Sequence, residues 1–168
     1  MAKSDSFFIR ARITTDGTTF KEEAIDLGAY VDALGKSVLR IHNISVKYGA
    51  GVFAPTLGSG SVQTTPFQLT TQSQIDMVVL DDKSVIASGG LVLSNASAAA
   101  SGVSTINDNM DVGPQHWTNG YLVGVEQIYL GTKSSISNPQ VTELSIMLEC
   151  TVETLSQNAA MALALSQQ

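Results

Sequence analysis

The sequence has little charge, one cysteine and no long hydrophobic run, and each shortage excludes a class of protein. Charged residues make up 14% of its 168 residues, against about 25% in a typical soluble domain. Cys150 is the only cysteine, so no disulfide forms within the chain and the core must hold the fold. No apolar run approaches the about 20 residues of a membrane-spanning helix. Residues 1–6 lack the apolar stretch of a signal peptide. We therefore expect synthesis as a soluble cytoplasmic protein without a membrane span.

Positive charge is concentrated in the first part of the chain. The net charge is −6, and seven of the nine basic residues lie within residues 1–50. The arginines are Arg10, Arg12 and Arg40, and no basic tail is present. Strong non-specific binding to nucleic acid is therefore disfavoured.

Uncharged polar residues take the place of the missing charges. Ser, Thr, Gln and Asn are frequent, and such a surface is desolvated at lower cost than an ionic one. A monomer in free solution usually carries more charge than this. The composition therefore favours a protein whose outside is largely covered by neighbours.

Short segments with β-type alternation, separated by turn residues, fill most of the chain. Residues 7–13 alternate, the pair Asp16-Gly17 favours a type I′ turn, and residues 18–27 return. This pattern predicts a hairpin that sets Arg10 opposite Glu23. Residues 37–48 predict a long strand whose alternation slips near His42, as at a β-bulge.

Further strands are predicted at residues 61–71, 74–80, 85–87, 91–93, 121–130 and 142–154. Pro66 places the first of them at an edge or a bulge. A turn is expected at Gly89-Gly90, and residues 49–60 and 94–114 are expected to be loops. Residues 142–154 give the clearest alternation, with Cys150 on the apolar face.

The last residues predict a short helix. Residues 156–168 are rich in alanine, and Ser156 is suited to the N-cap. So short a helix needs a packing partner, and Met161, Leu163 and Leu165 indicate that another subunit supplies it. The same three residues alternate, which keeps an exchanged β-strand as the other interpretation.

The pattern as a whole predicts an all-β protein. Eight or nine strands without a βαβ rhythm indicate an antiparallel β-sandwich of jelly-roll type, with a short C-terminal helix. An immunoglobulin-like sandwich is the second choice. We expect one domain over residues 1–168, with a flexible N-terminus at 1–6 and an assembly segment at 156–168.

The residue pattern does not indicate an enzyme. Cys150 lies on an apolar face, where a buried thiol is inert. His42 and His116 stand far apart and match no zinc-ligand spacing, and no nucleophile motif of hydrolases occurs. We predict neither catalysis nor a small-molecule substrate.

Calcium is the one metal that the sequence indicates. Asn107, Asn109 and Asp111 place oxygen-bearing side chains at alternate positions before a glycine. The glycine is one place late, and no glutamate follows at the twelfth position. Short Asp/Asn runs are more commonly plain turns, because their side chains bond their own backbone, so no cofactor is required.

In length and strand rhythm the whole chain resembles the small single-jelly-roll coat proteins of viruses, although no diagnostic motif carries the resemblance. It implies a structural protein that self-assembles as a homo-oligomer into a closed shell around a genome and is found in the virion. Because a basic arm is missing, any nucleic-acid contact would be weak or indirect and would fall to Arg10, Arg12 or Arg40.

Two other functions remain open at this point. One is a β-sandwich binding module, either virion-decorating or lectin-like, with Trp117 and Tyr121 in the ligand site. The other is a filament subunit, which differs from a shell subunit only in whether the contact closes.

Overall fold

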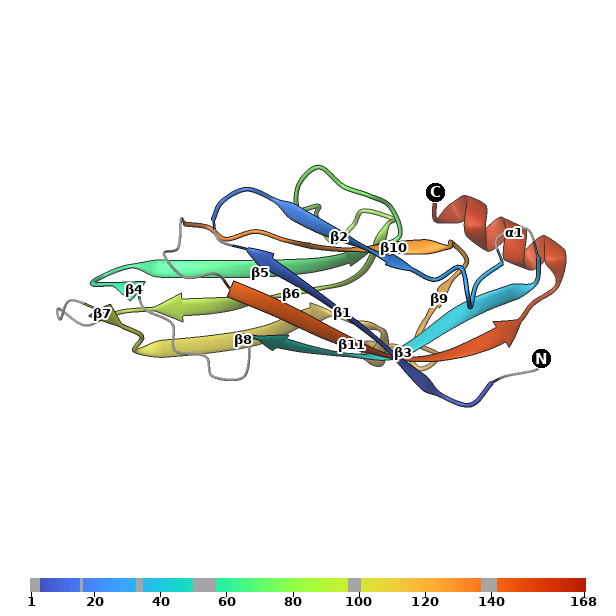
Figure 1. Cartoon of the computed structure of the whole chain (residues 1–168), viewed down its shortest axis with the longest axis horizontal. Coiled ribbons are helices and arrows are strands. Elements are labelled where there is room, and N and C mark those ends of the chain that lie inside the picture. The colour runs from blue at the N-terminus through green and yellow to red at the C-terminus, as the bar shows by residue number, and fades with distance from the viewer. Residues whose placement is uncertain (1–3, 16, 33–34, 50–56, 97–100, 137–141) are drawn as a thin grey trace.

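The computed structural model describes residues 4–15, 17–32, 35–49, 57–96, 101–136 and 142–168. These residues form short antiparallel strands, a 3₁₀ turn and a helix that follows the last strand (Figure 1). The elements are β1 (Phe7–Thr15), β2 (Lys21–Asp26), β3 (Ser37–Tyr48), β4 (Leu57–Gly58), β5 (Val62–Thr70), β6 (Val85–Ser94), β7 (Ser101–Gly102), β8 (Thr105–Val112), η1 (Pro114–His116), β9 (Tyr121–Val123), β10 (Gln127–Thr132), β11 (Thr142–Thr154) and α1 (Gln157–Ser166).

The long strands form two antiparallel sheets that face each other. One has the order β1-β11-β3-β9, and the other has the order β2-β10-β5-β6-β8. Along the chain, β1, β2 and β3 alternate between the sheets, and β9, β10 and β11 alternate again. This arrangement is a jelly roll, with β8 added at one edge. The predicted sandwich with a C-terminal helix is confirmed, and the immunoglobulin-like alternative is not adopted.

Side chains from the inner faces of both sheets fill the space between them. The alternation predicted for β11 is confirmed, since Leu144, Leu148 and Cys150 are fully buried. Burial of this kind is the main favourable term in the folding of such a domain. The other fully buried large side chains of the core come from both sheets and the segment after β2: Leu27, Leu39, Ile41, Phe67, Leu69, Ile86, Leu93, Ile128 and Leu130.

The predicted bulge in β3 is confirmed at His42. Asn43 and Ile41 pair with consecutive residues of β11, which leaves His42 as the extra residue. Because the bulge shifts the alternation by one position, Leu39, Ile41 and Ile44 all face the core. The long strand therefore keeps one buried face along its whole length.

The predicted hairpin of residues 7–27 is wrong. β1 pairs with β11 and β2 pairs with β10, so that Arg10 lies opposite Met147 and Glu23 lies opposite Leu130. The aspartate of the expected turn at residues 16–17 lies outside the described residues. Local alternation is the same whether a strand folds back within its sheet or crosses to the other sheet, so the pattern could not decide the partner.

Four further segments differ from the sequence prediction. Residues 74–80 form a loop rather than a strand, and residues 85–94 form the single strand β6 rather than two strands. Residues 121–130 divide between β9 and β10, which belong to different sheets. Residues 105–112, expected to be loop, form the edge strand β8.

The sequence predicts a turn at Gly89 and an edge or a bulge at Pro66, but both residues lie inside the second sheet. A Cβ on Gly89 would meet the carbonyl oxygen of Asn109 and would come within 2.8 Å of the Phe67 ring, so the glycine permits close approach of β8. Pro66 lies just beyond Phe67, where the ladder to β10 ends, and its carbonyl oxygen accepts the Thr132 hydroxyl at 2.7 Å.

The predicted C-terminal helix is confirmed. The Ser156 hydroxyl accepts the Ala159 N–H at 3.4 Å, and Ala160 and Ala164 are buried against the sandwich. The exchanged-strand interpretation is not adopted. Helix α1 lies at the end of the sandwich opposite β4 and β7 (Figure 1). In the described part of the chain, no helix has the length and apolarity to cross a bilayer.

Candidate assembly surfaces

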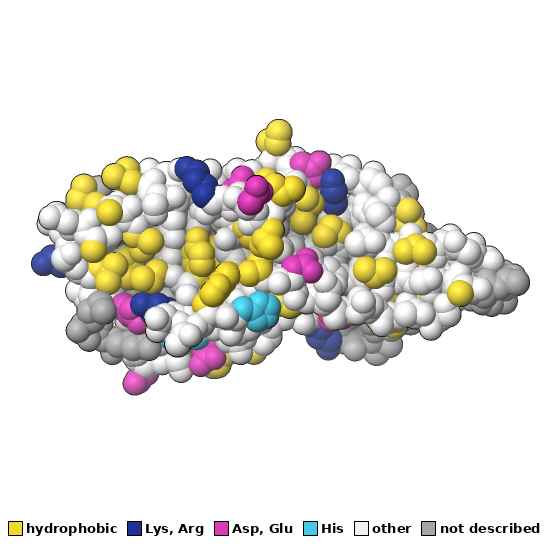
Figure 2. Space-filling model, turned by 180° about the vertical axis from the view of Figure 1, so that it is seen from behind, with side chains coloured by type: hydrophobic (Ala, Val, Ile, Leu, Met, Phe, Trp, Pro, Cys, Tyr) yellow, Lys and Arg dark blue, Asp and Glu magenta, His cyan; other side chains and the backbone are white. Residues whose placement is uncertain are grey.

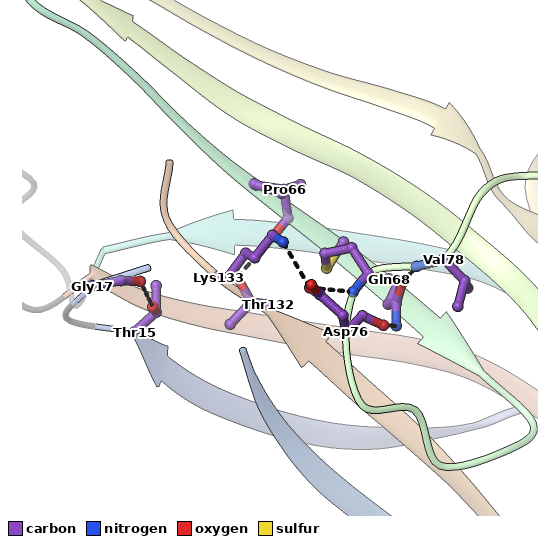
Figure 3. Close-up of polar contacts among 9 residues, drawn as sticks. Thr15, Gly17, Pro66, Gln68, Asp76, Val78, Thr132 and Lys133 are labelled. Carbon is purple, nitrogen blue, oxygen red and sulfur yellow. Dashed lines mark hydrogen bonds and ion pairs between the residues drawn. The ribbon is translucent and has the colours of Figure 1, made fainter. Parts of the chain in front are cut away.

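The loop between β5 and β6, residues 71–84, is fastened to the outer face of the second sheet. The Gln68 side chain of β5 donates to the Asp76 carbonyl oxygen at 3.4 Å and accepts the Val78 N–H at 2.8 Å. Lys133 forms a 2.6 Å ion pair with the Asp76 carboxylate (Figure 3). The hydrogen bond from Lys133 holds the pKa of Asp76 below its usual range. The middle of the loop is thus fixed by polar contacts.

Both ends of the loop are held as well. The Glu22 carboxylate of β2 accepts the Ser73 hydroxyl at 2.6 Å and the Gln74 N–H at 2.8 Å. Towards β6, the Asp82 carboxylate accepts both the hydroxyl and the N–H of Ser84. These bonds to charged groups are stronger than neutral ones, so the loop has a defined conformation.

Apolar side chains of this loop point into solvent. Ile75 is 99% exposed, Val79 72% and Leu80 59%. Figure 2 shows one face of the molecule, on which hydrophobic side chains lie among uncharged polar groups and few charges. A fixed loop with exposed aliphatic side chains is typical of a contact surface.

The predicted assembly residues of helix α1 lie in two environments, solvent and the surface of the sandwich. Met161 is 41% exposed and Leu165 68%. Leu163 packs on its own subunit, since a Cβ on Gly124 would come within 3.1 Å of its side chain. The packing partner that a short helix needs is therefore supplied within the chain, and Met161 and Leu165 remain the residues predicted to meet another copy.

Gln167 anchors the end of this helix and connects it to the loop. Its side chain is buried, accepts the Gly124 N–H at 2.8 Å and donates to the Leu122 carbonyl oxygen at 2.7 Å. Its carbonyl oxygen accepts the Thr71 hydroxyl at 2.9 Å and the Gln72 amide at 3.2 Å. Sequence reasoning missed this residue, because a polar residue after an alanine-rich helix gives no periodic signal.

The three arginines differ in what they contact. Arg40 forms two hydrogen bonds with the buried Glu153 carboxylate, at 2.7 and 2.8 Å, and donates to the Asn119 carbonyl oxygen. The bond to Glu153 raises the pKa of Arg40 further above its ordinary value. Its guanidinium is thus already engaged within the chain. Arg10 and Arg12 are exposed on β1, and nucleic-acid contact by any of the three stays a prediction.

Trp117 and Tyr121, the predicted ligand residues, also differ. Trp117 follows η1 and is 46% exposed. Tyr121 lies in β9, where its hydroxyl accepts the Gln167 amide at 3.4 Å and burial raises its pKa. Tyr121 therefore supports the helix anchor. The binding-module interpretation stays a prediction.

The predicted calcium residues lie on the edge strand β8. Asn109 donates its amide to the Asp111 carboxylate at 2.7 Å, and Asn107 is two residues before it. No group of three His, Cys, Asp or Glu residues that could hold a metal ion occurs in the described ranges. A calcium site here stays a prediction.

The remaining reactive side chains are Cys150 and the two histidines. Burial of the Cys150 thiol in the core raises its pKa to about 12. His42 at the bulge contacts the Thr151 hydroxyl at 2.9 Å, and His116 is exposed at the end of η1. The thiol is thus protonated and shielded from solvent.

No family model matches the sequence, and no curated protein matches it. Solved virus structures contain similar chains. One from Maize chlorotic mottle virus has 7% identity and a TM-score of 0.34, covering 91% of this chain and 96% of its own. One from Desmodium yellow mottle tymovirus has 13% identity and a TM-score of 0.34, covering 90% and 89%. One from turnip yellow mosaic virus has 14% identity and a TM-score of 0.30, covering 90% and 82%. The similarity to chains of these viruses extends over most of the length of each chain.

Proposed function

We propose that this protein is a structural subunit that assembles with copies of itself into a viral capsid or a similar closed shell. The observation that carries the proposal is the loop of residues 71–84. In this loop, Lys133 and Gln68 hold Asp76 in place, yet the side chain of the adjacent Ile75 is 99% exposed. Holding an isoleucine in water gives the monomer nothing, whereas covering it in an interface would stabilise an assembly.

Fold and composition support the same function. Jelly rolls occur in capsid proteins and in lectin domains, so the fold alone does not decide between assembly and ligand binding. The low charge content of 14% favours assembly, because such a surface is covered at low desolvation cost. We infer a non-catalytic role in the virion, with weak or indirect contact to the genome.

Particle formation by the purified protein tests this function. Light scattering after size exclusion and negative-stain electron microscopy should show closed particles far larger than 17.7 kDa. Open fibres would indicate a filament subunit instead. A single 17.7 kDa species at every concentration and salt would contradict self-assembly.

Two variants of Ile75 test the contribution of the loop. Ile75→Ser should weaken assembly without changing the melting temperature, because a side chain that is 99% exposed makes little contact within the subunit. Ile75→Leu keeps the apolar surface and should assemble like the parent protein. Equal assembly by both variants would remove this loop from the interface.

A further inference from the structure

A groove runs between the free edges of β1 and β2. These are edge strands of opposite sheets, and they lie next to each other on this side of the sandwich (Figure 1). Two hollows of about 730 and 600 Å³ make up the groove, and both are lined by Arg12 and Glu23. Beside the groove, Phe7 stacks on Tyr30 with 4.7 Å between the ring centres. The groove therefore has a packed aromatic pair next to it and two exposed strand edges as its walls.

The exposed charges of the two walls differ in sign, and the half-buried Lys21 also lines the β2 wall. Arg10 and Arg12 are exposed on the β1 wall, and Glu23 and Asp26 are exposed on the β2 wall. Asp26 uses one carboxylate oxygen to accept the Gly28 N–H at 2.8 Å. Within the described ranges, none of Arg10, Arg12 and Glu23 takes part in an ion pair.

Two ion pairs elsewhere are closed within the subunit. Arg40 is paired with Glu153, and Lys133 is paired with Asp76. A groove with exposed guanidinium groups on one wall and exposed carboxylates on the other has the electrostatic pattern of a surface that meets a complementary one.

We propose that this groove is a two-fold contact between copies of the chain, an inference that rests on the proposed self-assembly. A two-fold axis running along the groove places the β1 wall of one copy against the β2 wall of the other. Arg12 of each copy then faces a carboxylate of its partner, and each such pairing occurs twice. Phe8, which is 50% exposed and lines the groove, supplies apolar surface to the same contact.

Other occupants fit the charges less well. Nucleic acid would be attracted by Arg10 and Arg12 but repelled by the carboxylates of Glu22, Glu23 and Glu143, which line the same hollows. A peptide of one sign would meet one wall of like charge. A second copy is the partner whose charges match both walls at once.

Two charge-reversal variants test the contact, each by itself and in a mixture of the two. In Arg12→Glu, each copy presents a carboxylate to Glu23 of its partner, and in Glu23→Arg each presents a guanidinium to Arg12. Each variant alone should associate about tenfold or more weakly than the parent protein. In an equimolar mixture, an Arg12→Glu chain facing a Glu23→Arg chain has attractive pairs at both positions, so association should return. Sedimentation velocity over a concentration series measures all four samples.

The outcomes separate the contact from the proposed function. The melting temperatures should stay unchanged, because both side chains are exposed. Variants that assemble like a particle-forming parent protein would overturn the contact and leave the function standing. Weaker nucleic-acid retention by Arg12→Glu, stronger retention by Glu23→Arg and unchanged association would assign the groove to nucleic acid instead. A parent protein that stays monomeric would overturn the contact and the function together.

Discussion

The replacement Gln167→Ala should release the C-terminal helix from the sandwich. It removes the acceptor of the buried Gly124 N–H and the donor to the Leu122 carbonyl oxygen. A buried polar group left without a partner costs about 1–3 kcal/mol. Because Leu122 is only half-buried, water can partly replace its donor, and we expect a total loss of about 2–4 kcal/mol.

Thermal unfolding measures this loss. For a chain of this size, 1 kcal/mol shifts the melting temperature by about 2–4 °C, so a fall of about 5–15 °C is expected. Gln168→Ala is the matched control, since Gln168 is the exposed neighbour. Gln167→Met keeps much of the side-chain volume without its polar atoms and should melt like Gln167→Ala. Hydrogen exchange at the Gly124 amide should quicken in both Gln167 variants.

The reasoning would be refuted by a melting temperature of Gln167→Ala equal to that of Gln168→Ala. It would also fail if Gln167→Met unfolded like the parent protein, because packing rather than hydrogen bonding would then account for the anchor.

Two further predictions concern packing and reactivity inside the sandwich. Gly89→Ala should destabilise the fold by about 3 kcal/mol, because its Cβ would clash with β8. Gly102→Ala, where nothing lies within 4 Å of the added Cβ, should change stability by less than about 0.5 kcal/mol in the same urea titration. Equal losses would contradict this account. Cys150, with its pKa raised to about 12 by burial, should react with a chromogenic thiol reagent at pH 8 only as fast as the protein unfolds. Immediate labelling of the folded protein would show that the thiol is accessible.

Elements encoded within about ten consecutive residues could be predicted from the sequence. The strand at residues 142–154 has the same bounds in the structure, and Ser156 caps the helix as expected. The bulge at His42 was found because it interrupts one continuous alternation. In each case the signal and the structure lie in the same short segment.

Pairing between distant segments could not be predicted in this way. β1 finds its partner in β11, at the other end of the chain, although a nearby turn signal favoured β2. Gly89 gives the same signal for a turn as for close packing of two strands, and only the position of β8 distinguishes them. The alternation in the sequence predicts where strands lie but not which strands pair.

For the candidate surfaces, the sequence can indicate single apolar residues but not contacts between distant segments. Met161 and Leu165 were predicted because apolar residues near a helix end are conspicuous. Both are exposed, whereas Leu163, predicted with them, packs on Gly124, and contact with another copy stays a prediction. Ile75 was missed because alternation around it indicated a strand. The polar contacts of Gln68 and Lys133 that hold this loop join residues far apart in the sequence.

The few charged side chains of this protein have an ordered arrangement. Several of them hold the subunit together, as Arg40 does with Glu153 and Lys133 does with Asp76. At the edges of β1 and β2, the exposed charges are Arg10 and Arg12 on one side and Glu23 and Asp26 on the other. If charge served only solubility, exposed residues of both signs would be interspersed over the surface. Charges divided in this way instead specify orientation, since like charges meet when β1 of one copy faces β1 of the other. Apolar contacts at the loop and helix would then supply the affinity between copies, and the groove would determine how the copies are turned relative to one another.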